Sequence, residues 1–218
     1  MTGVRCVVFD FDGVLVDSNA IKRDAYRQVL EHRGASTELL NNCLASNPEG
    51  DRTEIIAALL GLLSGASSSL SAREEVERYV AAYSKVCLDG VSSCSEVLGA
   101  SAALQDLSGE FALYINSATP EAALEDVVAA RGWSRYFRNV MGKPHSKIEN
   151  LGRVVSHERV PADTIVFVGD KQLDLTAAVA FGCRFVGVRS DESDFREPCT
   201  MLETLEGLPA LVRGFGRD

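Results

Sequence analysis

Short apolar runs, rich in β-branched and aromatic residues, alternate along the chain with stretches of helical periodicity. A run of this length without polar alternation is typical of a strand that is buried on both faces of a sheet. The predicted strands are RCVVFD (5–10), FALYINS (111–117), a segment near 138–141, TIVFVGD (164–170) and RFVGV (184–188). The predicted helices among them lie around 95–107, 120–132, 147–157 and 171–181. This alternation predicts an α/β fold, a Rossmann-like parallel sheet with helices on both faces.

The segment between the first two predicted strands has a different pattern. Apolar residues recur there at helical spacing over 19–33, 37–45, 53–63 and 72–87, and no strand pattern appears. A block of helices in this place is an insertion after the first strand. The sequence therefore predicts an α/β core domain formed by residues 1–16 and 91–218, and a small all-helical cap domain formed by residues 17–90.

Composition narrows the classes of protein that the chain could belong to. Its 218 residues are 46% hydrophobic and 24% charged, which is typical of a globular protein with a proper core. The formal net charge of −9 argues against nucleic acid as a partner, and any site for an anion must be locally cationic. The longest apolar stretch, residues 55–63, is too short to span a bilayer, so we expect a cytoplasmic protein without membrane contact. Oligomeric state cannot be predicted from this sequence.

Polar residues stand at the ends of three predicted strands. Asp10 ends the first, Ser117 the second and Asp170 the fourth. In open parallel sheets, ligands bind beyond the carboxyl ends of the strands, so these side chains should meet there. Asp12 and Asp174 are expected on the same side, and four converging carboxylates would repel one another unless a cation lay among them. Mg²⁺ prefers such oxygen ligands and leaves positions for water and a phosphate.

These residues resemble the motifs of a known family. DFDGVLVD (10–17) resembles the first motif of the haloacid dehalogenase superfamily, and NSATP (116–120), GKPHSK (142–147) and GDKQLD (169–174) resemble its later motifs in the right order. The helical insertion after the first motif resembles the cap of the phosphoglycolate phosphatase-like members. The resemblance covers most of the chain and implies a capped hydrolase.

The resemblance also implies roles for the carboxylates. Asp10 would be the nucleophile and form an aspartyl-phosphate, which divides one slow displacement into two faster steps. Asp12 would protonate the leaving oxygen and later deprotonate the attacking water. Mg²⁺ would be held by the carboxylate of Asp10, the backbone carbonyl of Asp12, and Asp170, with Asp174 helping directly or through water.

Further roles carry over to the hydroxyl and lysine motifs. Ser117 and the amide of Ala118 would bind phosphoryl oxygens, and a lysine would offset charge in the transition state. Some relatives carry this lysine directly after the glycine, which points to Lys143, whereas others carry it four residues later, which points to Lys147. Both are present here, and the sequence favours Lys147.

The predicted cap contains a candidate for substrate recognition in NPEGDRTE (47–54). Capped relatives often have a loop there with glycine and a basic residue, and Gly50 and Arg52 resemble that element. Arginine suits a carboxylate or a second phosphate because its planar fork donates hydrogen bonds in pairs. Lys22 and Arg23, on the first cap helix, are weaker candidates.

The predicted function is a Mg²⁺-dependent phosphatase that hydrolyses a small phosphorylated metabolite, such as a sugar phosphate or phosphoglycolate. A phosphomutase on the same scaffold, of the β-phosphoglucomutase kind, matches the four motifs equally well and stays open as the alternative. A non-catalytic binding module is a third hypothesis. Such a module would be expected to lack Asp10, Asp12 or the Gly169–Asp170 turn, and all of these are present.

Overall fold

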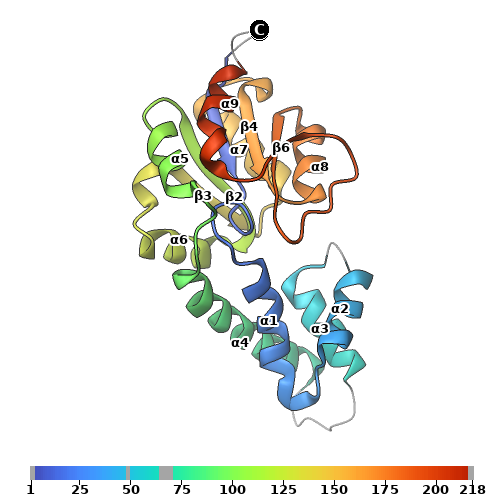
Figure 1. The fold of residues 1–218 in the computed structure, drawn as a ribbon. Helices are drawn as coiled ribbons and strands as arrows, with labels where there is room; N and C mark the ends of the chain where they lie inside the picture. Colours follow the sequence, from blue (N-terminus) through green and yellow to red (C-terminus); the bar gives the residue numbers. More distant parts are fainter. Residues whose placement is uncertain (1–2, 48–49, 64–70, 216–218) are drawn as a thin grey trace. The chain divides into compact units, whose positions relative to one another are not determined.

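The computed structural model describes residues 3–47, 50–63 and 71–215. Its strands form one six-stranded parallel sheet with the order β3-β2-β1-β4-β5-β6 (Figure 1). The strands are β1 (Cys6–Phe9), β2 (Ala112–Pro120), β3 (Phe137–Lys143), β4 (Ile165–Gly169), β5 (Arg184–Val188) and β6 (Thr200–Leu202). Every residue of β1 and of β4 is buried, as the uninterrupted apolar pattern of these segments predicts. The α/β class with a parallel sheet is therefore confirmed.

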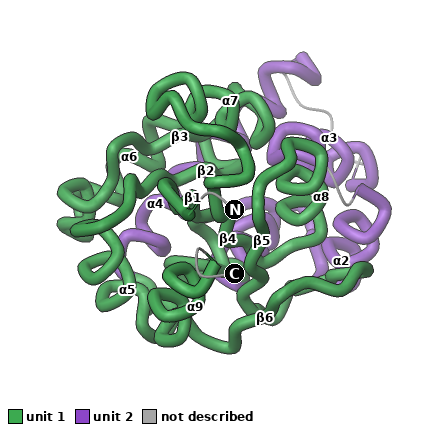
Figure 2. Tube along the Cα trace, turned by 90° about the horizontal axis from the view of Figure 1, so that it is seen from above, with its two compact units in different colours: residues 1–19, 94–218 green, residues 20–93 purple. Residues whose placement is uncertain are grey.

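Helices cover both faces of this sheet. They are α5 (Ala100–Leu107), α6 (Glu121–Ala130), α7 (Lys147–Glu158), α8 (Gln172–Phe181) and α9 (Leu208–Gly214). Helices α7 and α8 lie on one face, where they pack on a buried cluster that includes Val8, Tyr114 and Phe167. Helices α5, α6 and α9 lie on the opposite face (Figure 2). Because side chains alternate along a strand, Val8 faces α7 and α8 while its neighbours Val7 and Phe9 face the other layer.

Strand β1 lies between β2 and β4, and this arrangement determines where a site can form. From β1 the chain builds β2 and β3 on one side, and then crosses back to add β4, β5 and β6 on the other. The last residue of β1, Phe9, is in register with Val168 of β4 and with Ile115 of β2. The residues that follow these strands therefore emerge at one level, at the switch in strand order where open α/β sheets bind ligands.

The chain divides into two compact units, with unit 1 formed by residues 1–19 and 94–218 and unit 2 by residues 20–93 (Figure 2). The junctions thus fall after residues 19 and 93, whereas the sequence pattern predicts them after residues 16 and 90. Unit 2 contains helices and no strand among its described residues. Its helices are α1 (Asn19–Leu30, whose first residue belongs to unit 1), α2 (Thr37–Ser46), α3 (Arg52–Leu62) and α4 (Ala72–Ser93).

Unit 2 has an apolar core of its own. Leu30, Leu40, Ile56, Leu59 and Tyr79 are among its buried members. The helix starts follow capping rules: the Ser36 side chain caps α2, and Asp51 with Glu54 forms a capping box at α3. None of the helices that the structure describes has the length and apolar character that crossing a membrane requires.

Some element boundaries differ from the sequence-based prediction. The helix predicted from residue 95 begins only at Ala100, because Gly99 adopts a left-handed conformation with φ of 87°. A Cβ atom at that glycine would lie 2.7 Å from the backbone nitrogen of Glu206, so only glycine fits. Before this helix, the Val97 amide donates to the Leu15 carbonyl at 3.1 Å. Strand β6 and helix α9 were not predicted, because each is very short.

Candidate active site

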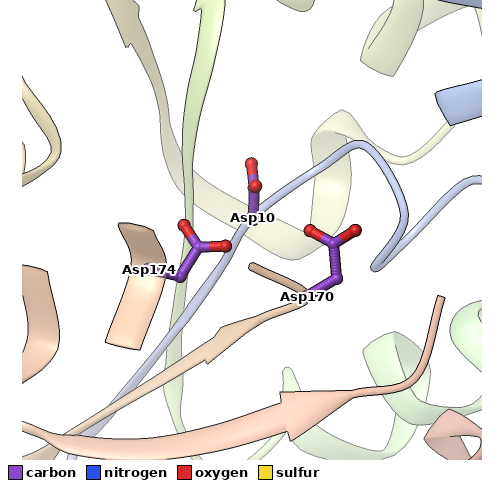
Figure 3. Close-up of side chains that lie close together, drawn as sticks. All are labelled: Asp10, Asp170 and Asp174. Atoms are coloured by element: carbon purple, nitrogen blue, oxygen red, sulfur yellow. The ribbon is translucent and has the colours of Figure 1, made fainter. Parts of the chain in front are cut away.

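Three aspartates meet at the carboxyl ends of β1 and β4. Asp10 directly follows β1, Asp170 directly follows β4, and Asp174 lies in the first turn of α8 (Figure 3). One carboxylate oxygen from each residue lies within 4.8 Å of the others, and all three residues are buried. The structure therefore brings together three of the four carboxylates that the sequence places at this edge.

The Asp170 carboxylate has one oxygen held by the protein and one that is not. Its Oδ2 accepts hydrogen bonds from the Asn19 side-chain amide at 2.9 Å and from the Ser190 hydroxyl at 2.8 Å. Its Oδ1 is buried and has no hydrogen-bond partner among the described residues. Burying a carboxylate oxygen without a partner costs free energy, and coordination of a cation would remove that cost. This oxygen is therefore a candidate metal ligand. Gly13, with φ of 76°, packs against Oδ2 so closely that a Cβ atom would clash.

Burial and mutual repulsion raise the pKa values of two of these carboxyl groups. Desolvation raises the pKa of Asp10 to about 7, and the nearby Asp174 and Asp170 carboxylates add to the rise while Lys147 opposes it. Desolvation, followed by the Asp174 charge, raises the pKa of Asp170 to about 6. Both pKa values rise for the same two reasons: the carboxyl groups are desolvated, and they lie close to other negative charges.

Lys147 is a protein cation that directly contacts this cluster. Its ammonium Nζ donates to Oδ2 of Asp10 at 2.9 Å and also pairs with Asp174. The two carboxylates hold the pKa of Lys147 above its ordinary value even though burial alone would lower it. Lys143, by contrast, is exposed at the end of β3. The structure thus places Lys147, and not Lys143, against Asp10.

Asp12 lies in surroundings of another kind. Its Oδ1 accepts a hydrogen bond from the Ser18 hydroxyl at 2.6 Å, and its Oδ2 accepts one from the Thr119 hydroxyl at 3.1 Å. The Ser117 hydroxyl is 3.5 Å from the same Oδ2. Serine and threonine hydroxyls can donate or accept, so this shell suits Asp12 with or without its proton.

A divalent metal ion fits the three-aspartate cluster. The Lys147 ammonium contacts Asp10 and Asp174, whereas the Oδ1 of Asp170 has no hydrogen-bond partner among the described residues and offers a ligand atom to a cation. The donors of the three side chains are all carboxylate oxygens, which favour a hard cation. Asn19 and Ser190 orient the Asp170 carboxylate from behind, as outer-shell partners of metal ligands do.

The remaining candidates are placed as follows. Ser117 is buried near the end of β2, and its hydroxyl accepts a hydrogen bond from the Thr119 amide at 3.1 Å, while Ala118 between them is exposed. Arg52 is the first residue of α3 in unit 2, where its guanidinium donates to the Ser84 hydroxyl at 3.1 Å and lies 5.8 Å from the centre of the Tyr83 ring. Gly50 donates its amide to the Asn47 carbonyl at 3.1 Å. Residues 48–49 of the same loop lie outside the described residues.

Sequence reasoning missed several residues that contact the site. Asn19 and Ser190 are far from Asp170 along the chain, and no spacing rule connects them. Thr119 could have been found, because it is the second hydroxyl of the motif that supplies Ser117. Asn116 could also have been found, because it is a polar residue inside an apolar strand. Burying such a residue costs free energy unless its amide is hydrogen-bonded, which indicates a specific role.

Comparison with known proteins agrees with this geometry. The sequence model of the haloacid dehalogenase-like hydrolases matches residues 7–188. A phosphoglycolate phosphatase from Yersinia pestis is 30% identical over 196 residues, which cover 85% of this chain and 81% of that protein. The chain therefore belongs to the haloacid dehalogenase-like hydrolase family and is an enzyme of that class.

Solved structures of low sequence identity share the fold. A predicted phosphoglycolate phosphatase from Haemophilus somnus 129pt superposes with a TM-score of 0.76 at 18% identity, covering 97% of this chain and 99% of that one. A variant of CbbY from Rhodobacter sphaeroides, in complex with xylulose-(1,5)bisphosphate, superposes with a TM-score of 0.75 at 16% identity, covering 94% and 96%. Both comparisons extend over nearly the whole chain, including the helical insertion.

Proposed function

We propose that this protein is a Mg²⁺-dependent phosphatase that hydrolyses a small phosphomonoester through an aspartyl-phosphate on Asp10. The observation that carries the proposal is the buried three-aspartate cluster, in which the Asp10 carboxylate accepts a hydrogen bond from the Lys147 ammonium and the Oδ1 of Asp170 has no partner among the described residues. An anionic group that approaches Asp10 needs positive charge on both sides. Lys147 supplies one of these charges, and the metal ion would supply the other.

The metal ligands would be the Asp10 carboxylate, the backbone carbonyl of Asp12, and Asp170, with Asp174 joining directly or through water. When bound, Mg²⁺ would neutralise charge on the phosphoryl group and balance the repulsion among the carboxylates. The raised pKa values of Asp10 and Asp170 in the metal-free protein support this assignment, because a cation among the carboxylates removes the cause of the rise.

Asp10 and Asp12 would divide the covalent chemistry between them. In the first step an oxygen of Asp10 attacks phosphorus, the bond to the leaving oxygen breaks, and Asp12 gives that oxygen its proton. In the second step Asp12 takes a proton from water, the hydroxide attacks phosphorus, and Asp10 leaves as a carboxylate with free phosphate as the product. The hydroxyl shell of Asp12 supports this double role, since it can bond both protonation states.

Ser117, the amide of Ala118 and Lys147 would bind the phosphoryl oxygens. Stabilisation of this kind supplies most of the catalysis in phosphoryl transfer, because the charge on those oxygens changes during the reaction. The contact of Lys147 with Asp10 supports its role as the charge-balancing lysine, and the exposed Lys143 has no comparable support.

The substrate would be a small phosphorylated metabolite, of the size of phosphoglycolate or a sugar phosphate. Support comes from the 30% identical phosphoglycolate phosphatase and from the bisphosphate held by the CbbY variant of similar fold. Arg52 would read a second anionic group of that substrate. Its guanidinium is already oriented by Ser84 and Tyr83, so little side-chain freedom is lost on binding.

The test is release of phosphate from p-nitrophenyl phosphate with Mg²⁺ present. Asp10→Asn should lower the rate by about 10⁴-fold or more, because an amide is a poor nucleophile and cannot carry the phosphoryl group. Asp126→Asn, at an exposed site on α6, is the matched control and should keep the wild-type rate. Wild-type rates in Asp10→Asn would refute the proposal, and an isomerised sugar phosphate in place of free phosphate would favour the phosphomutase.

A further inference from the structure

Two asparagines are fully buried beside Lys147, where apolar residues would be expected. Asn116 follows the buried apolar residues Leu113, Tyr114 and Ile115 on β2, and Asn150 lies on the inner face of α7. Buried amides cost free energy unless their donors and acceptors are paired. The pairing of these two amides therefore indicates what they do.

One of the two side-chain hydrogen bonds of Asn116 joins it to the backbone of Lys147, and the other joins it to Asn150. Its Nδ2 donates to the backbone carbonyl of Lys147 at 2.9 Å, and its Oδ1 accepts from the Nδ2 of Asn150 at 3.0 Å. Asn150 is held in turn, because its Oδ1 accepts from the Arg153 guanidinium at 3.0 Å and its Nδ2 also reaches the Gly142 carbonyl at 3.4 Å. The two amides thus connect β2, the end of β3 and the first turn of α7.

Lys147 needs such an anchor because of where it lies. It is the first residue of α7, directly after the cap residue Ser146, and the amino-terminal end of a helix disfavours a cation. The pull of Asp10 and Asp174 on its ammonium offsets that cost, but it acts only on the far end of a flexible side chain. The hydrogen bond from the Asn116 side chain fixes the backbone of Lys147. Because Asn116 directly precedes Ser117 on β2, the same strand positions both the Ser117 hydroxyl and, through Asn116, the backbone of Lys147.

We propose that Asn116 and Asn150 are positioning residues, which hold Lys147 so that its ammonium lies over Asp10. Neither side chain contacts Asp10 or the metal ligands through any hydrogen bond that the described part of the chain contains. They act on the reaction through Lys147 alone. The inference rests on the proposed phosphatase function.

The test is a double-mutant cycle on the hydrolysis of p-nitrophenyl phosphate. Leucine is close to asparagine in shape, so Asn116→Leu removes the two hydrogen bonds and fills the same space. We expect kcat to fall by about 10- to 100-fold with KM changed by less than about threefold, because misplacing a catalytic group by about 1 Å costs up to about 10²-fold. Asn150→Leu should cost less, about three- to tenfold, because it acts through Asn116. Asn139→Leu, at an exposed site on β3, is the control and should keep the wild-type kcat.

The decisive comparison repeats both substitutions in a Lys147→Ala background. If the asparagines act through Lys147, each should then change kcat by less than about twofold, since interacting residues are not additive. Equal fold losses in the two backgrounds would overturn the inference and leave a purely structural role. If Asn116→Leu does not fold, as judged by its melting transition, the Asn150→Leu cycle decides by the same criterion.

Failure of the proposed function would be visible separately, as a wild-type protein that releases no phosphate. The inference would then be decided by a crystal structure of Asn116→Leu, or of Asn150→Leu if the first does not fold. Displacement of the Lys147 ammonium from hydrogen-bond distance of Asp10 would support it. An ammonium still 2.9 Å from Oδ2 of Asp10, as in the wild type, would overturn it.

Discussion

Asp10 and Asp12 are two residues apart, yet their surroundings have little in common. Asp10 lies in a buried cluster of charged groups with Asp170, Asp174 and the ammonium of Lys147. The carboxylate of Asp12 accepts hydrogen bonds from the hydroxyl groups of Ser18 and Thr119. The surroundings of Asp10 favour a bound cation and fix the orientation of its carboxylate. The surroundings of Asp12 can form hydrogen bonds with its carboxyl group in both the protonated and the ionised state.

The difference teaches how two identical side chains can take different roles in one reaction. A nucleophile must be aimed and kept free of its proton while the phosphoryl group arrives, and fixed charges do this. A group that gives and then takes a proton must be stable in both states, and neutral hydroxyls permit this. Environment thus assigns the role, as in other enzymes with paired carboxylates.

Asp12→Asn should separate the two steps, and its effect is expected to be the largest after that of Asp10→Asn. Loss of the proton donor and acceptor should slow turnover of p-nitrophenyl phosphate by about 10²- to 10⁴-fold. Because nitrophenolate leaves readily without help, the first step should survive better than the second, and one equivalent of nitrophenol should appear in a burst. Rapid-quench measurement would show it. A variant with a single slow phase and no phosphoenzyme would contradict the division of roles.

Lys147→Ala should lower kcat by about 10²- to 10³-fold, because it removes the one protein cation that contacts Asp10 among the described residues. Lys143→Ala is the matched control, since Lys143 lies four residues earlier and is exposed. It should change kcat by less than about twofold. Steady-state kinetics on the same substrate measure both. The reverse order of losses would assign the motif lysine to Lys143.

Ser190→Ala should weaken Mg²⁺ binding by about tenfold, because Asp170 loses one of the two donors that orient it. Calorimetric titration with Mg²⁺ measures this without any substrate. Ser156→Ala removes a comparable hydroxyl from the exposed face of α7 and should leave the affinity unchanged. An unchanged affinity in Ser190→Ala would mean that Asn19 alone suffices, or that the metal does not use Asp170.

The contribution of Asp10 and Asp170 to the stability of the metal-free protein should fall as the pH rises, and this is the smallest effect. The folded state raises the pKa of Asp10 to about 7 and of Asp170 to about 6, above the ordinary value of 3.8 that applies when the chain is unfolded. The folded state therefore binds these protons more tightly, so its extra stability is full below about pH 4 and is lost by about pH 7.

Melting temperatures measured with a chelator at about pH 5 and about pH 8 test this contribution. Added Mg²⁺ should raise the melting temperature more at the higher pH, where the carboxylates have lost their protons and can bind it. The exposed pair Lys85–Asp89 gives a reference, since Asp89→Asn should shift both melting temperatures alike. An equal gain from Mg²⁺ at the two pH values would contradict the account.

Much of the fold and part of the site could be predicted from the sequence because both depend on local patterns. The apolar runs identify the buried strands, and the positions after them identify Asp10, Ser117 and Asp170. The partners of Asp170 could not be predicted, because Asn19 and Ser190 reach it only once the chain has folded. The preference for Lys147 over Lys143 came from a motif, whereas its contact with Asp10 depends on where α7 begins.

Asn116 lies between these cases. A polar residue inside an apolar strand was visible in the sequence, but its partner Asn150 is 34 positions away and on a helix. The late start of α5 could not be predicted for a similar reason, since the backbone of Glu206, far along the chain, lies where a Cβ atom at position 99 would be. Local patterns identify elements, and contacts between distant elements determine their ends and their buried polar partners.

The central claim is that an oxygen of Asp10 is aimed at phosphorus beside a bound magnesium ion. A crystal structure of the protein with Mg²⁺ and beryllium fluoride tests it most directly, because this reagent forms a bond to a carboxylate that can accept a phosphoryl group. We expect beryllium on a carboxylate oxygen of Asp10, with Mg²⁺ bound between that residue and Asp170. A bare Asp10 carboxylate with the metal elsewhere would contradict the account.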